Sequence, residues 1–271
     1  MIPAAFDHKR AGSADEALSL LAEYGDEAKL LAGGHSLLPL MKLRLAQPEV
    51  LIDIGDVADL SYVEARDGHV AIGALTRHRD VERSDVLASS VPLLAHAAGH
   101  VGDPQVRNRG TLGGSLVHGD PASDLPAVAL ACGATMVIRG PGGERQVAAT
   151  DFFTGFLETA VGPDELLTEI RFPVASGGWS FQKFNRRAQD WAIVGCAVQQ
   201  GGGVALVNMG SQPALSSAAS DALASGADAA AVGAAAADES SPPADIHADA
   251  DYRRHLARVL VERAVTEASA Q

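Results

Sequence analysis

The chain has 271 residues, 47% of them hydrophobic, which is enough for one large or two modest globular domains with buried cores. Its 21 basic and 34 acidic residues give a net charge of −13, which disfavours nucleic acid and anionic membranes as non-specific partners, because both attract a basic face. No run approaches the roughly 18 apolar residues that span a bilayer, and no export signal opens the chain. We therefore expect a cytoplasmic protein without an integral membrane segment, and association with the inner face of the membrane is left open.

The first elements of the sequence alternate between helix and strand. Ser13 and Glu16 occupy the N-cap and N3 positions of a capping box, which predicts a helix that ends near residue 23. The next predicted elements are a strand at 29–32, a short helix at 37–43 and a buried strand at 50–54.

A loop with two glycines and a serine, AGGHS at 32–36, comes at the end of the first predicted strand. Glycine lets a backbone turn tightly enough to aim successive N–H groups at one point without a Cβ in the way. Such nests of amide donors bind phosphate oxygens, and a serine hydroxyl adds a further donor. Alone, this loop would be interpreted as a turn.

The middle of the chain adds a hairpin, two helices and a second loop of the same kind. The hairpin strands are expected at 63–65 and 70–72, and the helices at 76–82 and 92–99. The second loop, TLGGS at 111–115, again pairs two glycines with a serine. Two such loops predict two walls of one pyrophosphate site, although the serines would also be explained as caps of the segments that follow.

Strands dominate the rest of the predicted order. A strand pair is expected at 135–138 and 145–147, followed by a single strand at 164–172. A domain boundary is predicted at 175–178. Beyond it we expect three strands at 179–185, 192–199 and 204–208, an alanine-rich stretch at 213–238 that forms one or two surface helices with a loose linker, and a final helix at 252–268.

Catalytic and metal-binding patterns are scarce. Cys132 and Cys196 lie in apolar surroundings and are expected to be buried, inert thiols, so this chain alone cannot supply the four thiolates of an iron–sulfur cluster. His96 and His100 are four residues apart without a third ligand, so no metal site is predicted. GxGxxG after a strand, P-loop and GxSxG motifs are absent as well. We predict no catalytic residue and expect that a cofactor supplies the chemistry.

The run LVHGDPASDLP at 116–126 completes a set of three motifs. AGGxS, TxGGS and DPxSDLP, in this order, resemble the FAD-binding subunits of the molybdenum hydroxylases, the xanthine dehydrogenase family. The stretch at 32–48 is most similar to the medium subunits of aerobic carbon monoxide dehydrogenases, and the likeness extends over essentially the whole chain.

The resemblance implies an α+β (α/β) fold in two domains. The first, at 1–175, would be a PCMH-type FAD-binding domain with subdomains at about 1–57 and 58–175. The second, at 176–271, would be a smaller domain in which a three-stranded sheet packs with helices.

The resemblance also implies which residues bind FAD. They are Ala32, Gly33, Gly34, His35, Ser36, Thr111, Leu112, Gly113, Gly114, Ser115, Asp124, Leu167, Lys183 and Trp191. The glycines would be positions of close approach to the diphosphate, and Ser36 and Ser115 would donate to its oxygens. His35 would reach the phosphates or the flavin edge, or would simply be solvated. Asp124 would accept hydrogen bonds from hydroxyls of FAD, and would also be explained as a helix N-cap.

The same resemblance places Lys183 and Trp191 near the flavin ring and Leu167 in contact with the cofactor. Lys183 would stabilise the anionic reduced ring from its N1/O2 edge, with Asp190 as a charge partner, or would belong to a surface basic run. Trp191 stands where relatives place a tyrosine beside the isoalloxazine, or would be plain core. Leu167 would offer apolar or backbone contact to the cofactor.

The function that the resemblance implies is electron transfer within a larger enzyme. FAD would be bound non-covalently between the two domains, would receive electrons from two [2Fe–2S] clusters of a small partner chain and would pass them to an external acceptor, a quinone. A large partner chain with molybdenum and molybdopterin cytosine dinucleotide would oxidise carbon monoxide, in a dimer of heterotrimers. The alternatives are a molybdenum hydroxylase for xanthine, an aldehyde or an N-heterocycle, a free-standing flavoenzyme, and a flavin-free maturation or scaffold protein.

Overall fold

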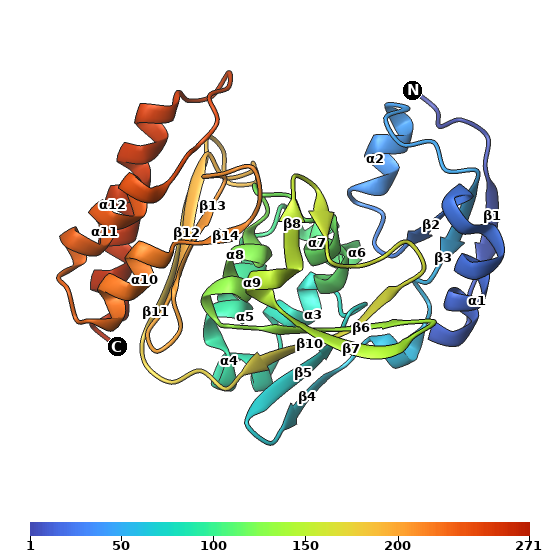
Figure 1. Ribbon diagram of the computed structural model, residues 1–271, viewed down its shortest axis with the longest axis horizontal. Coiled ribbons are helices and arrows are strands. Elements are labelled where there is room, and N and C mark those ends of the chain that lie inside the picture. The colour runs from blue at the N-terminus through green and yellow to red at the C-terminus, as the bar shows by residue number, and fades with distance from the viewer.

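Three large sheets follow one another along the molecule, each with its own helices, and a fourth sheet has only two short strands (Figure 1). The computed structural model describes all residues from 1 to 271. The first sheet is parallel, whereas the second and third are antiparallel. This mixture of helices and sheets confirms the α+β fold class expected from the sequence.

The first sheet has the order β1-β3-β2, with β1 at Asp7–Arg10, β2 at Ala28–Leu31 and β3 at Val50–Asp53. Helix α1 (Ala14–Tyr24) begins where the capping box predicts, since Ser13 Oγ accepts a hydrogen bond from the Glu16 N–H. The apolar start of β3 is buried, because a central parallel strand is covered on both faces. Helix α2 (Leu37–Lys42) follows the first glycine-serine loop.

The second sheet has the order β4-β5-β10-β6-β7. Its strands are β4 (Val63–Arg66), β5 (His69–Gly73), β6 (Thr135–Gly140), β7 (Gly143–Ala148) and β10 (Leu166–Pro173). Both predicted strand pairs, β4-β5 and β6-β7, are antiparallel hairpins. Strand β10 joins them, which places residues far apart in the sequence side by side.

Six helices connect β5 to β6, and all of them except α6 bury side chains in the core that the second sheet shares (Figure 1). They are α3 (His78–Glu82), α4 (Asp85–Ser90), α5 (Pro92–Gly99), α6 (Pro104–Arg109), α7 (Leu112–His118) and α8 (Asp124–Ala131). After β7, a turn of helix and a small hairpin lead to β10. They are α9 (Ala149–Phe152), β8 (Phe153–Gly155) and β9 (Glu158–Thr159).

The third sheet has four strands, one more than the sequence predicted. Its strands are β11 (Trp179–Phe184), β12 (Val194–Gln199), β13 (Val204–Val207) and β14 (Ala214–Leu215). The additional strand β14 has two residues, which is too short for an alternating pattern to be recognised.

The alanine-rich stretch forms two helices, α10 (Ser217–Ala224) and α11 (Ala229–Glu239), beside the long α12 (Ala250–Ala268). Helix α11 buries one face, in contrast to the predicted surface helix, because its small residues allow close packing. A Cβ added to Gly233 would lie 3.3 Å from the Glu262 backbone nitrogen in α12. None of the helices has the length and apolarity that crossing a bilayer requires.

One hydrophobic core joins the middle of the molecule to the third sheet. Buried side chains of the third sheet, such as Phe181 and Val207, belong to the same cluster as Leu125 and Val128 of α8. The opposite face of this sheet packs against α11 and α12 in a second cluster. The third sheet is therefore covered on both faces, and α5 and α8 lie between the two antiparallel sheets.

Candidate functional site

The first glycine-serine loop has four successive backbone donors without an acceptor in the chain. These N–H groups belong to residues 33–36, between β2 and α2. Gly34 has φ +77°, a left-handed conformation that favours glycine. Ser36 stands at the N-cap position of α2, but its hydroxyl makes no capping hydrogen bond, so the capping alternative for this serine is wrong. The loop has the unsatisfied donors that an anionic group requires.

The two loops meet at the residues that precede the second one. A Cβ added to Gly33 would collide with Arg109 O and would lie 2.8 Å from Gly110 Cα. Glycine is therefore required at position 33 because two backbones approach each other there. Although Gly33 and Gly110 are far apart in the sequence, the fold places them in contact.

The second loop uses its backbone donors within the protein. The N–H groups of Leu112, Gly113 and Gly114 donate to Thr76 O (3.0 Å), Ala74 O (2.8 Å) and Thr111 Oγ1 (3.1 Å). A Cβ on Gly113 would lie 2.6 Å from Ala74 Cβ. Gly113 thus permits close packing against the segment after β5, while Thr111 caps α7 and the Leu112 side chain is buried in the core. Unlike the first loop, the second loop has no row of free backbone N–H groups. Its role is to support the first loop.

Ser115 connects the second loop to the motif that follows it. Its hydroxyl lies 2.8 Å from the hydroxyl of Ser123. Ser123 occupies the N-cap position of α8, so Asp124 is the first residue inside the helix and the N-cap interpretation of Asp124 is wrong.

Asp124 and Lys183 form a buried ion pair between α8 and β11. Lys183 Nζ lies 2.7 Å from Asp124 Oδ2 and 3.0 Å from His100 O, and both charged side chains are only 5–6% exposed. Asp124 Oδ1 is buried without a partner. Burial raises the pKa of Asp124 to about 6, although the neighbouring Lys183 lowers it.

Two further expectations about Lys183 are wrong. Asp190 is not its charge partner, because Asp190 Oδ2 lies 3.5 Å from Arg186 Nε and 3.8 Å from Arg187 Nε. Nor does Lys183 belong to a surface basic run, since strand alternation turns its side chain inward toward α5 and α8.

The remaining predicted residues differ in exposure. Trp191 is 61% exposed, so it is not core. Its neighbour Ala192 accepts a hydrogen bond from Asn208 Nδ2 (2.9 Å), and the Asn208 N–H donates to Pro121 O (2.7 Å), which fastens the Trp191 segment to the motif before α8. The Leu167 side chain is buried in the core of the second sheet, which leaves only its backbone for contact with a ligand.

Arg77 and His78 adjoin both loops but were not among the predicted site residues. Arg77 donates through Nη1 to Arg109 O and through Nη2 to Gly55 O, the latter at 3.2 Å. A Cβ on Gly110 would lie 2.7 Å from His78 Cδ2, so the imidazole is directly beneath the loop. His78 Nδ1 is buried without a partner, and burial, followed by the charges of His35 and two arginines, lowers the pKa of His78 to about 4.

A signal for Arg77 and His78 exists in the sequence. They form a polar pair directly after the buried segment at 74–76, which continues the chain from the end of β5. Polar residues at the end of a buried strand are candidates for a site, and the same argument would have selected them.

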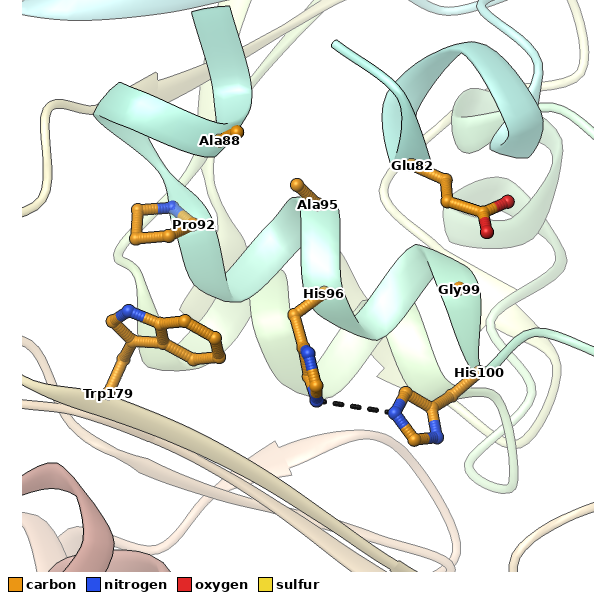
Figure 2. A pocket seen from close by; sticks show the side chains of 8 residues that line it. All are labelled: Glu82, Ala88, Pro92, Ala95, His96, Gly99, His100 and Trp179. Atoms are coloured by element: carbon orange, nitrogen blue, oxygen red, sulfur yellow. Dashed lines mark hydrogen bonds between the residues drawn. The ribbon is translucent and has the colours of Figure 1, made fainter. Parts of the chain in front are cut away.

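An open pocket between α5 and β11 lies apart from the loops (Figure 2). His96 and His100 turn their Nε2 atoms toward each other at 3.2 Å, and the Trp179 ring centroid lies 5.2 Å from that of His96. Burial, followed by the charge of His96, lowers the pKa of His100. No group of three or more potential ligands is gathered here or elsewhere in the chain.

Comparisons with known proteins agree over the whole chain. The family model described as the FAD binding domain in molybdopterin dehydrogenase matches residues 4–175, and the CO dehydrogenase flavoprotein C-terminal domain matches residues 179–268. The carbon monoxide dehydrogenase medium chain of Hydrogenophaga pseudoflava is 41% identical, with 100% of this chain and 99% of that protein covered.

Solved structures give the same result. A chain of carbon monoxide dehydrogenase from Hydrogenophaga pseudoflava, in a form that lacks the Mo-pyranopterin moiety of its molybdenum cofactor, matches with a TM-score of 0.95 and 41% identity, with 100% of this chain and 99% of that chain covered. A chain of quinoline 2-oxidoreductase from Pseudomonas putida 86 matches with a TM-score of 0.92 and 32% identity over the same shares.

Proposed function

Because the chain belongs to the FAD-binding medium subunits of carbon monoxide dehydrogenases and related molybdenum hydroxylases, which are oxidoreductases, we propose that it is the electron-transfer flavoprotein of an aerobic carbon monoxide dehydrogenase. Two observations carry the proposal: the row of four free backbone donors in the first loop, and the buried Asp124 carboxylate with one unpaired oxygen. These are groups that a dinucleotide with a diphosphate and free hydroxyls satisfies.

The first loop would hold the diphosphate of FAD. Its free N–H groups and the unbonded Ser36 hydroxyl would donate to the phosphate oxygens. The second loop would set the position of the first, because its own amides are engaged within the protein and Gly110, the residue before it, contacts Gly33.

Asp124 and Lys183 would act at the hydroxyls and at the ring. Asp124 Oδ1 is free to accept from a hydroxyl, while Oδ2 keeps its bond to the lysine. Lys183 would place a positive charge beside the N1/O2 edge of the ring, and its second bond to His100 O fixes the ammonium in place. FAD supplies the redox chemistry, since its ring accepts and releases electrons. Trp191 is exposed and would cover a face of the ring, without the hydroxyl that a tyrosine would add.

The wider proposal concerns the division of the chain and its partners. We place the domain boundary at about residue 175, with subdomains at 1–57 and 58–175 and a C-terminal domain at 176–271. Electrons would come from [2Fe–2S] clusters of a small subunit, after oxidation of substrate on a large molybdenum subunit, and would leave to a quinone. The assembly would be a dimer of heterotrimers in the cytoplasm, at the inner face of the membrane if the quinone is a membrane quinone.

Another molybdenum hydroxylase remains the second candidate. The full-length match to a quinoline oxidoreductase at 32% identity shows that the same fold serves a heterocycle-oxidising enzyme. Substrate oxidation belongs to the partner subunit, so the residues of this chain do not discriminate between the two. The higher identity to the carbon monoxide dehydrogenase medium chain favours carbon monoxide.

The test is anaerobic reduction of the co-expressed three-subunit complex. Carbon monoxide is expected to bleach the visible flavin band, and a quinone is expected to restore it. Bleaching by quinoline, xanthine or an aldehyde, but not by carbon monoxide, would contradict the substrate and leave the flavin-subunit function standing. A complex whose flavin is reduced by none of them would contradict the electron-transfer function.

A further inference from the structure

We propose that Arg77 is a positioning residue that holds the two glycine-serine loops at the separation required for the diphosphate of FAD. The inference rests on the proposed FAD function and adds to it a residue outside the three sequence motifs. Arg77 lies in the extended segment between β5 and α3 and forms a β-bridge with Thr111, the first residue of the second loop.

The guanidinium joins two backbone carbonyls from different parts of the fold. Nη1 donates to Arg109 O, and this is the carbonyl that faces Gly33 where the loops meet. Nη2 donates to Gly55 O at 3.2 Å, just after β3 of the first sheet. A planar fork with separate donors can hold both acceptors at once, which a single ammonium in one direction cannot do equally well.

Gly55 is itself fixed close to the first loop. Its N–H donates to Asp53 Oδ1 at 2.9 Å, and a Cβ on Gly55 would lie 3.6 Å from Ala32 O, the carbonyl before Gly33. Arg77 therefore connects the base of the first loop to the residue before the second loop. Through this connection, the parallel first sheet is held against the helices that follow β5.

The charge of Arg77 has no carboxylate as its partner. Both hydrogen bonds of its guanidinium go to carbonyl oxygens. Three acids lie near enough to raise the pKa of Arg77, but each is closer to another base. The pairs are Asp53 with His8 at 3.4 Å, Asp56 with Arg10 at 3.8 Å and Asp80 with Arg79 at 3.5 Å. The half-buried guanidinium thus adds a positive potential beside the free amides of the first loop, which favours an anionic ligand.

His78 supports the same segment from the other side. Its backbone N–H donates to Gly110 O at 3.0 Å, and its ring lies beneath Gly110. Because backbone and ring already support Gly110, loss of the Arg77 side chain would loosen the contact between the loops without removing the second loop from its place.

The test compares Arg77→Lys and Arg77→Gln with Arg83→Gln in the full-length protein. Arg83 is an exposed arginine at the end of α3 with no side-chain partner, so Arg83→Gln controls for the loss of one positive charge. We expect both Arg77 variants to raise the dissociation constant for FAD about tenfold, and Arg83→Gln to leave it within about twofold. At saturating FAD, the reduction potential and visible spectrum should equal those of the unmodified protein, because Arg77 does not reach the ring.

Two results would overturn the inference. One is FAD binding by Arg77→Lys and Arg77→Gln as tight as in the unmodified protein. The other is a changed potential or spectrum of the saturated variants together with a lower melting temperature of the apo form, which would indicate general damage to the fold. Absence of FAD binding by the unmodified protein would instead contradict the proposed function, and the inference with it.

Discussion

At the scale of single residues, the buried pair of Asp124 and Lys183 is the feature that packing alone does not explain. In many proteins, the free energy lost when two charges leave water exceeds the free energy gained from their attraction. Hydrophobic residues of similar volume often stabilise the fold as well as, or better than, such an ion pair. Here the carboxylate also keeps an unpaired buried oxygen. We propose that this pair at the junction of α8 and β11 serves binding, because the hydroxyls of FAD would satisfy the free oxygen.

Asp124 makes the free energy of unfolding of the apo protein decrease as the pH rises. Burial raises its pKa to about 6 in the folded protein, above the ordinary value of 3.8. Between these values the folded state binds the proton more tightly, so stability from this group is greatest below pH 3.8 and is lost as the pH rises through 6.

The prediction for Asp124→Asn follows from that sign. The stability of the unmodified protein relative to Asp124→Asn should fall between about pH 4 and pH 6.5 by an amount on the order of 2 kcal/mol. Urea unfolding of the two proteins at several pH values measures the difference. A difference that rises with pH over this interval would mean that Asp124 is ionised with a lowered pKa in the folded state.

At the scale of elements, the first loop and its flanking segments form the unit that the function needs. Gly34 has φ +77°, and an added Cβ would lie 2.9 Å from Leu38 Cδ1 in α2. Gly68, at the tip of the β4-β5 hairpin, has a similar φ of +72° with open space around it. The two glycines share a backbone conformation but differ in their neighbours.

Gly34→Ala and Gly68→Ala therefore make a matched pair. Each should cost about 1 kcal/mol of folding free energy, because an L-residue is strained in the left-handed region. Only Gly34→Ala should weaken FAD binding, by about tenfold or more, since it displaces the donors next to α2. Melting temperatures and FAD titrations distinguish these effects, and equal FAD affinities of the two variants would contradict the role of the first loop.

The sequence allowed the longer strands and the two loops to be predicted better than several of the short elements. Gly33 and Gly34 follow an apolar strand, and neighbouring residues alone are enough to recognise this pattern. Helices α4, α6 and α7 have six or seven residues, fewer than two turns, so no apolar period could reveal them. The partners of Lys183 and Gly113 could not be predicted either, because both depend on tertiary contacts that no local pattern contains.

At the scale of the whole molecule, the shared core joins the part that holds the loops to the part that carries Lys183. The third sheet is packed by α8 on one face and by α12 on the other. Lys183 lies on β11 of this sheet and Trp191 in the segment between β11 and β12, while the loops come from the earlier elements. If FAD binds between the two parts, as we propose, its binding depends on one rigid arrangement of both.

We therefore expect the chain to unfold in a single cooperative transition. Phe181 is 5% exposed in the shared core, and Phe181→Ala should destabilise the whole protein by about 3–4 kcal/mol. Phe184, on the same strand but 37% exposed, provides the control, and Phe184→Ala should cost much less. Calorimetry should show one peak that moves as a unit in Phe181→Ala. Two peaks, of which only one moves, would contradict a common core.

The most direct test of the account is the flavin content of the purified protein. The chain, alone and in its co-expressed complex, is incubated with FAD, freed of excess and denatured with acid, and the released flavin is identified and quantified. We predict one FAD per chain, released without covalent attachment, and a visible flavin spectrum before denaturation. Absence of flavin from both preparations, or stoichiometric FMN in place of FAD, would contradict the assignment of the first loop as a diphosphate site.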